Sequence, residues 1–345
     1  MNVLVTGASG FIGRRLVARL LRGGCSVGAF VRTPRSLDRA LAEQAGLTVV
    51  PGVVEDRAAL ERAAAGRDAI VHLAAVAGGV DEAAVHAVNV GGTENVLAAA
   101  RASGVGRVVF TSTISAARER LGPYGATKRL AEERVRAAGV PFVILRPSLV
   151  YGGSDVGLVA SLVHWLRSFP VMPVIGNGRI EIDPIHLDDL CAVIESCLVR
   201  DDVLGRTFDV LGPDRVTLDE FLRRLGDVIG VRRSLLHLPA RPALVLARLL
   251  SAVMSRPPLT VDNVLGLTSP ARVDRGAAVR TFPIAWTPLD VGLRALAGRR
   301  AHTRSSPLLP SCSRTWSRCA RSASRSWASG AWASRTPPSC RCSPT

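Results

Sequence analysis

The chain begins Met1-Asn-Val-Leu-Val-Thr6-Gly7-Ala-Ser-Gly10-Phe-Ile-Gly13 and continues with helix-forming residues to Arg22. The pattern predicts a short buried strand, a glycine turn and a helix, in that order. In such a unit the first glycine permits the tight turn, the second lets the backbone approach a pyrophosphate, and the third lets the helix pack closely on the sheet. The helix N-terminus adds free amides and a positive dipole. The stretch therefore predicts a dinucleotide-binding unit.

Further apolar runs follow along the chain, separated by helical stretches. They cover residues 26–31, 47–50, 69–74, 107–111 and 142–145. This alternation predicts βαβ units and a Rossmann-like α/β fold, in which helices cover both faces of a doubly wound parallel sheet. Ligands of such sheets bind beyond the carboxyl ends of the strands. The residues that follow each strand are therefore expected to line one crevice.

One pair of residues stands out beyond that scaffold. Of the 44 basic residues only Lys128 is a lysine, and it lies four positions after Tyr124, one of two tyrosines. Pro123 suits a first helical position and good helix formers follow it, so Tyr124 and Lys128 are expected on one helix face. A phenol titrates near pH ~10, and a neighbouring ammonium favours its anion. The pair predicts a tyrosine that takes up or returns a hydroxyl proton, with its pKa lowered by the lysine.

The organisation changes after Tyr151. We expect a dinucleotide-binding domain over residues 1–150, completed by strands and a helix within 180–211, and a smaller substrate lobe over most of 151–298. Residues 179–186 are interpreted as a strand returning to the sheet.

Residues 235–254 are nearly apolar, which raises the question of a membrane span. Arg241, Arg248 and two prolines argue against one, because charges at the centre of a bilayer are costly. We therefore predict a helix over the substrate pocket. Peripheral membrane contact is the less favoured alternative.

From Arg299 onward the composition changes. The tail has no acidic residue, nine arginines, three of the five tryptophans and four of the seven cysteines, and without its nine charges the formal net charge drops from +16 to +7. We interpret residues 299–345 as a disordered extension, unselected or produced by a frame shift, because no pattern there would bury a core. Nucleic-acid binding through this basic tail is the less favoured alternative.

The body of the chain contains three scattered cysteines in apolar or helical contexts, Cys25, Cys191 and Cys197, which indicates reduced thiols. No constellation of residues there predicts a metal site. Since no secretory or transmembrane signal precedes the first strand, a cytoplasmic location is expected.

Several motifs follow one another in an order typical of one enzyme family. They are Thr6–Gly13, Val71–Ala75, Asn89–Val96, Val109–Thr113, Tyr124–Lys128, Leu145–Gly152 and Asp183–Asp189. With them, most of residues 1–298 resembles the extended or atypical short-chain dehydrogenases/reductases, the NAD(P)-dependent epimerase/dehydratase family. Residues 257–263 and 289–296 resemble the members akin to the nucleotide-binding accessory subunit of respiratory complex I.

The resemblance implies roles for particular residues. Tyr124 would be the acid/base, Lys128 its partner and a ribose ligand, and Thr113 the hydroxyl that orients the substrate oxygen, with Ser112 less favoured for that role. The interval from Thr113 to Tyr124 is shorter than sugar-nucleotide members usually show, which weakens a sugar assignment. The cofactor is expected to contact Gly7, Ser9, Gly10, Phe11, Ile12, Gly13, Arg32, Arg35, Leu73, Ala74, Ala75, Thr111, Tyr124, Lys128 and Pro147.

The end of the second strand bears on the choice of nicotinamide. An acid there would bond the ribose 2′-hydroxyl of NAD, whereas an arginine accommodates the 2′-phosphate of NADP. The chain has Arg32 and Arg35 and no acid at this strand end. NADP is therefore favoured, with NAD as the alternative.

Together these features predict an NAD(P)-dependent oxidoreductase, epimerase or dehydratase that transfers hydride to or from a secondary alcohol or ketone. A nucleotide sugar is among the candidate substrates. The alternative is a non-catalytic structural or assembly protein that binds NADPH. The expected partner is a small-molecule substrate, and a homodimer is left open.

Overall fold

The computed structural model of the protein describes residues 1–77, 81–153, 158–253 and 259–303. Residues 1–299 form one compact unit around a seven-stranded sheet whose neighbouring strands are all parallel. In spatial order the strands are β11 (Arg206–Val210), β6 (Phe142–Pro147), β5 (Arg107–Thr111), β4 (Ala69–His72), β1 (Asn2–Thr6), β2 (Ser26–Val31) and β3 (Leu47–Pro51). The predicted doubly wound parallel sheet is confirmed.

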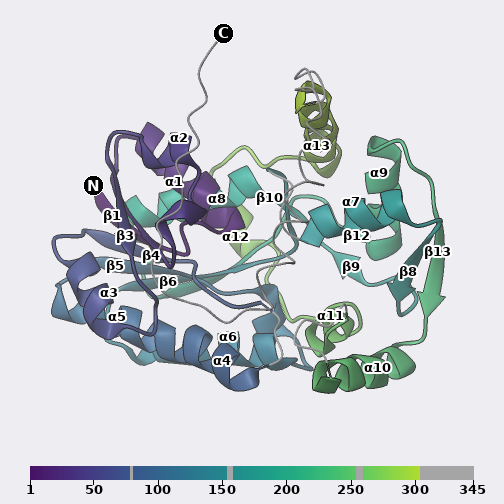
Figure 1. Ribbon diagram of the computed structural model, residues 1–345, viewed down its shortest axis with the longest axis horizontal. Coiled ribbons are helices and arrows are strands. Elements are labelled where there is room, and N and C mark those ends of the chain that lie inside the picture. Colours follow the sequence, from purple (N-terminus) through teal and green to yellow (C-terminus); the bar gives the residue numbers. More distant parts are fainter. Residues whose placement is uncertain (78–80, 154–157, 254–258, 304–345) are drawn as a thin grey trace, which may run out of the picture. The chain divides into compact units, whose positions relative to one another are not determined.

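Helices cover both faces of this sheet (Figure 1). One face packs against α1 (Phe11–Arg22), α2 (Arg39–Ala42), α8 (Leu187–Val199) and α12 (Ala277–Thr281), and the other against α3 (Arg57–Ala64), α4 (Glu82–His86), α5 (Gly92–Ala102) and α6 (Pro123–Ala137). Successive residues of a strand point to opposite faces. Val3 and Val5 therefore pack into the core beneath α1 and α8, while Leu4 packs into the core beneath α3 and α5. Burial on both sides explains why the strands are apolar throughout.

Three short turns of helix connect these elements: η1 (Pro34–Ser36), η2 (Ala87–Gly91) and η3 (Ile114–Ala117). The remaining elements are β7 (Val150–Tyr151), α7 (Leu158–Ser168), β8 (Val171–Ile175), β9 (Glu181–Ile182), β10 (Ile185–His186), β12 (Val216–Thr217), α9 (Leu218–Val228), β13 (Ser234–Leu238), α10 (Ala240–Val253), α11 (Val261–Gly266) and α13 (Leu289–Thr303). Most of them build a second cluster of apolar side chains around Tyr151 and Phe221. β10 instead contributes Ile185 to the core beneath α1 and α8, and α10 and α11 pack together in a small cluster of their own. A domain boundary near residue 150 stays a prediction, because the described residues up to 299 form one unit.

Two expectations about the second half are wrong in detail. Residues 179–186 do not return to the central sheet, since β9 pairs with β12 and β10 pairs with β7. Pro184 stands between β9 and β10, lacks a backbone donor, and separates them into two short strands. The strand that completes the sheet within the predicted range is β11.

The apolar run at residues 235–254 is also not one helix. Its first part is β13, which pairs with β8, and α10 begins only after Pro239. Pro239 disfavours a helical conformation at the residue before it, so the helix cannot begin earlier. Pro239 also lacks a backbone donor for strand pairing, so the strand ends before it. In the described part of the chain no helix combines the length and apolarity that crossing a membrane requires. The tail assigned to residues 299–345 lies outside the described residues from 304 onward.

Candidate functional site

The glycine turn between β1 and α1 has the close backbone contacts that its sequence predicts. Gly7 adopts a φ of +68°, and a Cβ there would lie 2.7 Å from the backbone nitrogen of Ala74. A Cβ at Gly13 would clash with the Gly7 carbonyl oxygen. Gly10 is the N-cap of α1 and offers no side chain to the first amides of the helix. Those amides are therefore free for an anionic ligand, which the helix dipole also favours.

A chain of buried polar groups holds the end of β4 against this turn. The Thr6 hydroxyl accepts from the Ala74 amide at 3.3 Å and lies 2.7 Å from Nδ1 of His72. On the other side, Nε2 of His72 lies 3.1 Å from the Thr93 hydroxyl, which donates to the Asn89 carbonyl at 2.6 Å. Because Thr93 uses its proton on Asn89, it accepts from Nε2–H, and Nδ1 accepts from Thr6. Burial lowers the His72 pKa to about 3, with a contribution from Lys128, so the imidazole is neutral.

Arginines surround the end of β2. Arg14 joins the glycine turn to the loop after β2, since it donates to the Ser9 carbonyl at 2.8 Å and to the Ser36 carbonyl at 2.7 Å. Arg32 and Arg35 are exposed, and neither forms an ion pair within the described ranges. The two guanidinium groups are thus available to a ligand next to the glycine turn.

Tyr124 and Lys128 lie one turn apart on α6, as predicted. The buried Lys128 ammonium donates to the Thr111 carbonyl at 2.7 Å and lies 4.0 Å from the centre of the Phe110 ring. Burial lowers the Lys128 pKa to about 7, although the Glu132 carboxylate opposes this shift. Tyr124 is half-buried, and its hydroxyl makes no hydrogen bond to any described residue.

The expectation that Lys128 makes the Tyr124 phenol unusually acidic is wrong. The Tyr124 pKa is raised to about 12, first by burial and second by the carboxylate of Asp262. Desolvation disfavours the phenolate, and a nearby negative charge disfavours it further. At neutral pH the Tyr124 hydroxyl is therefore protonated.

Thr113 and Ser112 differ in how their hydroxyls are used. Ser112 is buried and donates to Glu132 at 2.6 Å, so it has no free donor for a substrate. Thr113 is half-buried and accepts from the Ser115 amide at 3.2 Å, which leaves its own O–H group as a donor. Ser112 is therefore poorly placed to orient the substrate oxygen. Thr113 remains the candidate for that role.

Glu132 anchors this face of α6 from within the protein. Its side chain is fully buried and accepts a bidentate pair from Arg146 at 2.7 and 2.6 Å, together with the bond from Ser112. Burial opposes ionisation of Glu132, but the hydrogen bonds from Arg146 and Ser112 outweigh it and hold its pKa below the usual value. This charged cluster connects β5, β6 and α6 beneath the candidate catalytic residues.

Asp262 reaches α6 from α11, far away in the sequence. Its carboxylate accepts from the backbone amides of Tyr124 at 3.1 Å and Gly125 at 3.4 Å. The N-cap of α6 is Gly122, which supplies no side-chain cap, and any side chain there would clash with the Asp262 carboxylate. Asp262 therefore caps the helix that bears Tyr124 and Lys128.

Asn89 connects the segment after β4 with α6. It lies in η2, a single turn of π-helix, and exchanges hydrogen bonds with the backbone of Val76 at 2.8 and 3.1 Å. Its amide also donates to the Thr127 hydroxyl at 3.1 Å, which in turn donates to the Tyr124 carbonyl at 3.0 Å. Such π-turns are frequent at functional sites.

The sheet order brings the predicted site residues to one edge. Pro147, Thr111, the segment from Leu73 to Ala75, the glycine turn and Arg32 follow the neighbouring strands β6, β5, β4, β1 and β2 at their carboxyl ends. The Thr111 hydroxyl is buried there without a hydrogen-bond partner, which suggests that a ligand supplies one. Uncapped amides on α1, unpaired arginines and this orphaned hydroxyl fit a dinucleotide.

Comparison with known proteins agrees with this geometry. Residues 3–210 match the NAD dependent epimerase/dehydratase family. The chain belongs to this family. A 2-alkyl-3-oxoalkanoate reductase of Stenotrophomonas maltophilia is 32% identical over 68% of this chain and 77% of the relative. A ceramide reductase of Caulobacter vibrioides is 30% identical over 83% of this chain and 86% of the relative.

Among solved structures, the UDP-glucuronic acid 4-epimerase of Bacillus cereus in complex with UDP-glucuronic acid and NAD is similar in fold. Its TM-score is 0.70 at 21% identity, over 88% of this chain and all of the other. Membership of the epimerase/dehydratase family makes the protein an NAD(P)-dependent oxidoreductase or epimerase of the short-chain dehydrogenase/reductase type.

Three residues of this family member have roles that the sequence did not reveal. Arg14 follows the glycine motif and Asp262 lies within the stretch 257–263, but neither was given a role, and their contacts span 22 and 138 positions along the chain. Asn89 lies within a recognised motif, and that motif could have marked it as a functional residue. Its hydrogen-bond partner Thr127 is brought close only by the fold.

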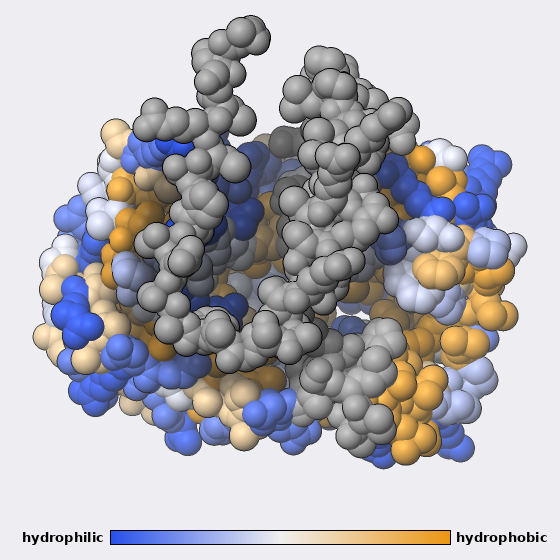
Figure 2. Space-filling model, viewed as in Figure 1, coloured by the Kyte–Doolittle hydropathy of each residue, from blue (hydrophilic) through white to orange (hydrophobic). Residues whose placement is uncertain are grey.

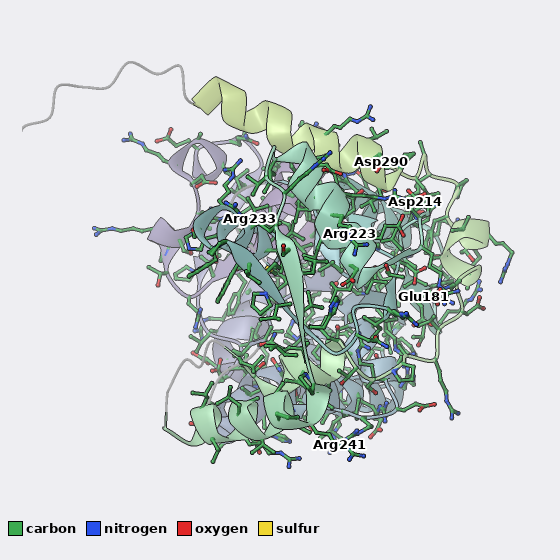
Figure 3. All side chains as sticks on the ribbon, turned by 90° about the vertical axis from the view of Figure 1, so that its right-hand side faces the viewer. Glu181, Asp214, Arg223, Arg233, Arg241 and Asp290 are labelled. Carbon is green, nitrogen blue, oxygen red and sulfur yellow. The ribbon has the colours of Figure 1, made fainter. Side chains whose placement is uncertain are left out.

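A polar hollow lies away from the strand ends, between the segment 177–179, β12, α9 and β13. It is lined by Asn177, Gly178, Arg179, Thr217, Asp219, Arg223 and His237. Figure 3, which views the molecule from the right-hand side of Figure 1, labels Arg223, one of the residues that line the hollow. Asp219 is already bonded to Nε2 of His237 at 3.0 Å and lies 3.7 Å from Arg223, so the hollow is a satisfied polar network. None of the predicted site residues lines it.

Proposed function

We propose that the protein reduces a ketone on an apolar substrate, with NADPH as the cofactor and Tyr124 as the proton donor. The main support is the state of Tyr124. Its hydroxyl is free of hydrogen bonds within the described residues, and its pKa is raised to about 12. A group that is protonated at neutral pH is suited to act as a general acid.

The hydroxyl proton of Tyr124 is the one that reduction of a ketone requires. Reduction of a ketone develops an alkoxide, which is a much stronger base than a phenolate, so transfer of the Tyr124 proton to it is favourable. Oxidation of an alcohol would need Tyr124 as a base, and burial together with Asp262 disfavours its phenolate. We infer reduction because Tyr124 holds the proton that this step needs and because both reported relatives are named as reductases.

The other residues have roles that follow from their contacts. A bound dihydronicotinamide supplies hydride. Thr113 donates its hydroxyl proton toward the substrate oxygen, where negative charge develops. Lys128 lies one turn from Tyr124 on α6, is held by the Thr111 carbonyl, and offers its remaining donors to a ribose.

The class of substrate is inferred from two observations. Both relatives are reductases, one of 2-alkyl-3-oxoalkanoates and the other named for ceramide, a lipid. The short loop between Thr113 and Tyr124 is bound to the segment 269–272, through the Arg120 amide to the Ser269 hydroxyl at 3.0 Å and the Glu119 amide to the Pro270 carbonyl at 3.2 Å. An alkyl-substituted ketone is thus favoured over a nucleotide sugar.

NADPH is favoured over NADH because of the arginines beyond β2. Arg32 and Arg35 are exposed and free of ion pairs in the described part of the chain, and a guanidinium binds phosphate in bidentate fashion. Arg14 holds the neighbouring loop in place through the Ser36 carbonyl. Together they suit the 2′-phosphate.

Turnover of NADPH with an alkyl-branched 3-oxoalkanoate tests this function, with UDP-glucuronic acid as the competing substrate. Tyr124→Phe should retain NADPH affinity and lose at least about a hundredfold in kcat, the usual contribution of general acid–base catalysis. Tyr151→Phe is the matched control, because Tyr151 is fully buried and its hydroxyl has no partner. A wild-type protein that binds NADPH but reduces neither compound would support the non-catalytic alternative.

A further inference from the structure

Helix α10 turns three of its large apolar residues outward, whereas Leu244 packs against the buried cluster. Val245, Leu246 and Leu249 are 56%, 50% and 61% exposed, while the small residues Ala243 and Ala247 are buried. A surface helix of a globular protein normally has the opposite arrangement, with its large apolar side chains toward the core. The outward face of α10 is therefore built for contact with something other than water.

The apolar surface extends into the strand before α10. Leu236 and Leu238 of β13 are 53% and 39% exposed. Figure 2 shows hydrophobic residues gathered at the lower right of the molecule, over the region of α10 and β13. We call these five side chains, from β13 and α10, the apolar patch. Isolated exposed leucines are ordinary, but a cluster on consecutive elements marks an interaction surface.

Positive charge flanks the apolar patch on α10, whereas Arg232, just before β13, is paired with Asp227. The sequence from Val228 to Val261 contains five arginines and no aspartate or glutamate. Arg241 and Arg248 are seven positions apart, which places them along one side of α10, and both are exposed. Neither forms an ion pair with any described residue. Figure 3, which views this side of the molecule, shows Arg233 near β13 and Arg241 at α10.

We propose that the apolar patch docks on the surface of an anionic lipid membrane. An apolar face flanked by arginines is the arrangement of helices that lie in the plane of a bilayer interface. Leucines and Val245 enter the boundary between headgroups and acyl chains, while Arg241 and Arg248 pair with lipid phosphates. The docking is peripheral and needs no membrane-spanning helix.

A second copy of the chain fits the patch less well. In a two-fold symmetric dimer the same surface faces itself, so the arginines of the two copies would come together without an acidic residue to separate them. Like charges across an interface are unfavourable. An anionic lipid surface complements both the apolar and the basic parts of the patch.

Packing contacts link the helix of the apolar patch to the candidate site. Ala243 and Ala247 of α10 pack with Val264 of α11, and Asp262 at the start of α11 caps the helix of Tyr124. Membrane docking would therefore place the site near a source of apolar substrates. The docking proposal goes beyond the reductase proposal and does not depend on it, since binding to vesicles requires no turnover.

Co-sedimentation of the full-length protein with vesicles tests this proposal. Vesicles of phosphatidylglycerol and phosphatidylcholine in equal parts should bind the protein, vesicles of phosphatidylcholine alone much less, and added salt should weaken the binding. Arg241→Gln with Arg248→Gln should reduce the affinity ~25-fold, at about fivefold for each arginine. Leu246→Ser with Leu249→Ser should reduce it by at least roughly tenfold.

Matched controls separate the patch from general charge and from residues 304–345, which are present in every variant. Val199→Ser alters an equally exposed apolar residue on α8, and Arg22→Gln with Arg62→Gln removes two exposed arginines from α1 and α3. Both controls should bind like the wild type. Equal binding of the α10 variants and the wild type would overturn the proposal, as would a wild type that ignores anionic vesicles. A dimer that only the leucine variants dissociate would assign the patch to a second copy instead.

Discussion

Asp262→Ala should weaken the fold and the chemistry together, because this one carboxylate caps the helix that bears Tyr124. Loss of a helix N-cap costs about 0.5–2 kcal/mol. Loss of a negative charge at the N-terminus of a 15-residue helix adds roughly 0.3–1 kcal/mol. At about 2–4 °C per kcal/mol, Tm should fall by roughly 2–12 °C.

Asp56→Ala is the matched control for this change. Asp56 caps α3 by accepting from the Ala59 amide at 3.0 Å, and α3 bears none of the candidate catalytic residues. Both alanine variants should lose stability, whereas only Asp262→Ala should lose turnover. Asp262→Asn retains one acceptor oxygen without the charge, so it should recover part of the lost stability.

The effect on chemistry has a defined sign. The Asp262 carboxylate raises the Tyr124 pKa, so its removal lowers that pKa. If Tyr124 acts as an acid, activity is lost as pH rises through its pKa, and this alkaline loss should begin at lower pH in both Asp262 variants. Thermal unfolding and a pH–rate profile measure the two effects. An Asp262→Ala protein with an unchanged Tm and an unchanged alkaline limb would refute the reasoning.

Three further outcomes are expected. Arg32→Ser with Arg35→Ser should weaken NADPH binding by at least about tenfold and leave NADH binding nearly unchanged in fluorescence titrations, and an equal loss for both would contradict a 2′-phosphate site. Gly13→Ala should abolish binding of either nucleotide, because its Cβ would clash with the Gly7 carbonyl. For His72, whose pKa is lowered from 6.5 to about 3, the unfolded state binds the extra proton, so stability present above pH 6.5 is lost as pH falls toward 3, at up to about 1.4 kcal/mol per pH unit. Urea unfolding should show that acid slope in the wild type and a shallower one in His72→Gln.

Local sequence alone was enough to predict the parallel sheet with helices on both of its faces. Residues 1–13 specify a strand, a turn and the start of a helix through a short apolar run and through glycines at positions where the tight turn leaves no room for a side chain. The apolar runs of the later strands indicate burial on both faces, and a parallel sheet then brings all their carboxyl ends to one edge. Short-range patterns of this kind do not depend on distant parts of the chain.

Contacts between distant segments decided the rest. The pairing of β10 with β7, the pairing of β13 with β8 and the cap that Asp262 gives to α6 each depend on partners that no local pattern identifies. The Tyr124 pKa is the clearest case. A lysine four positions away predicts an acidic phenol, but the folded chain buries that phenol and places a carboxylate from residue 262 beside it. Electrostatic energies depend on distance and solvent exposure in three dimensions, and neither is a property of sequence spacing.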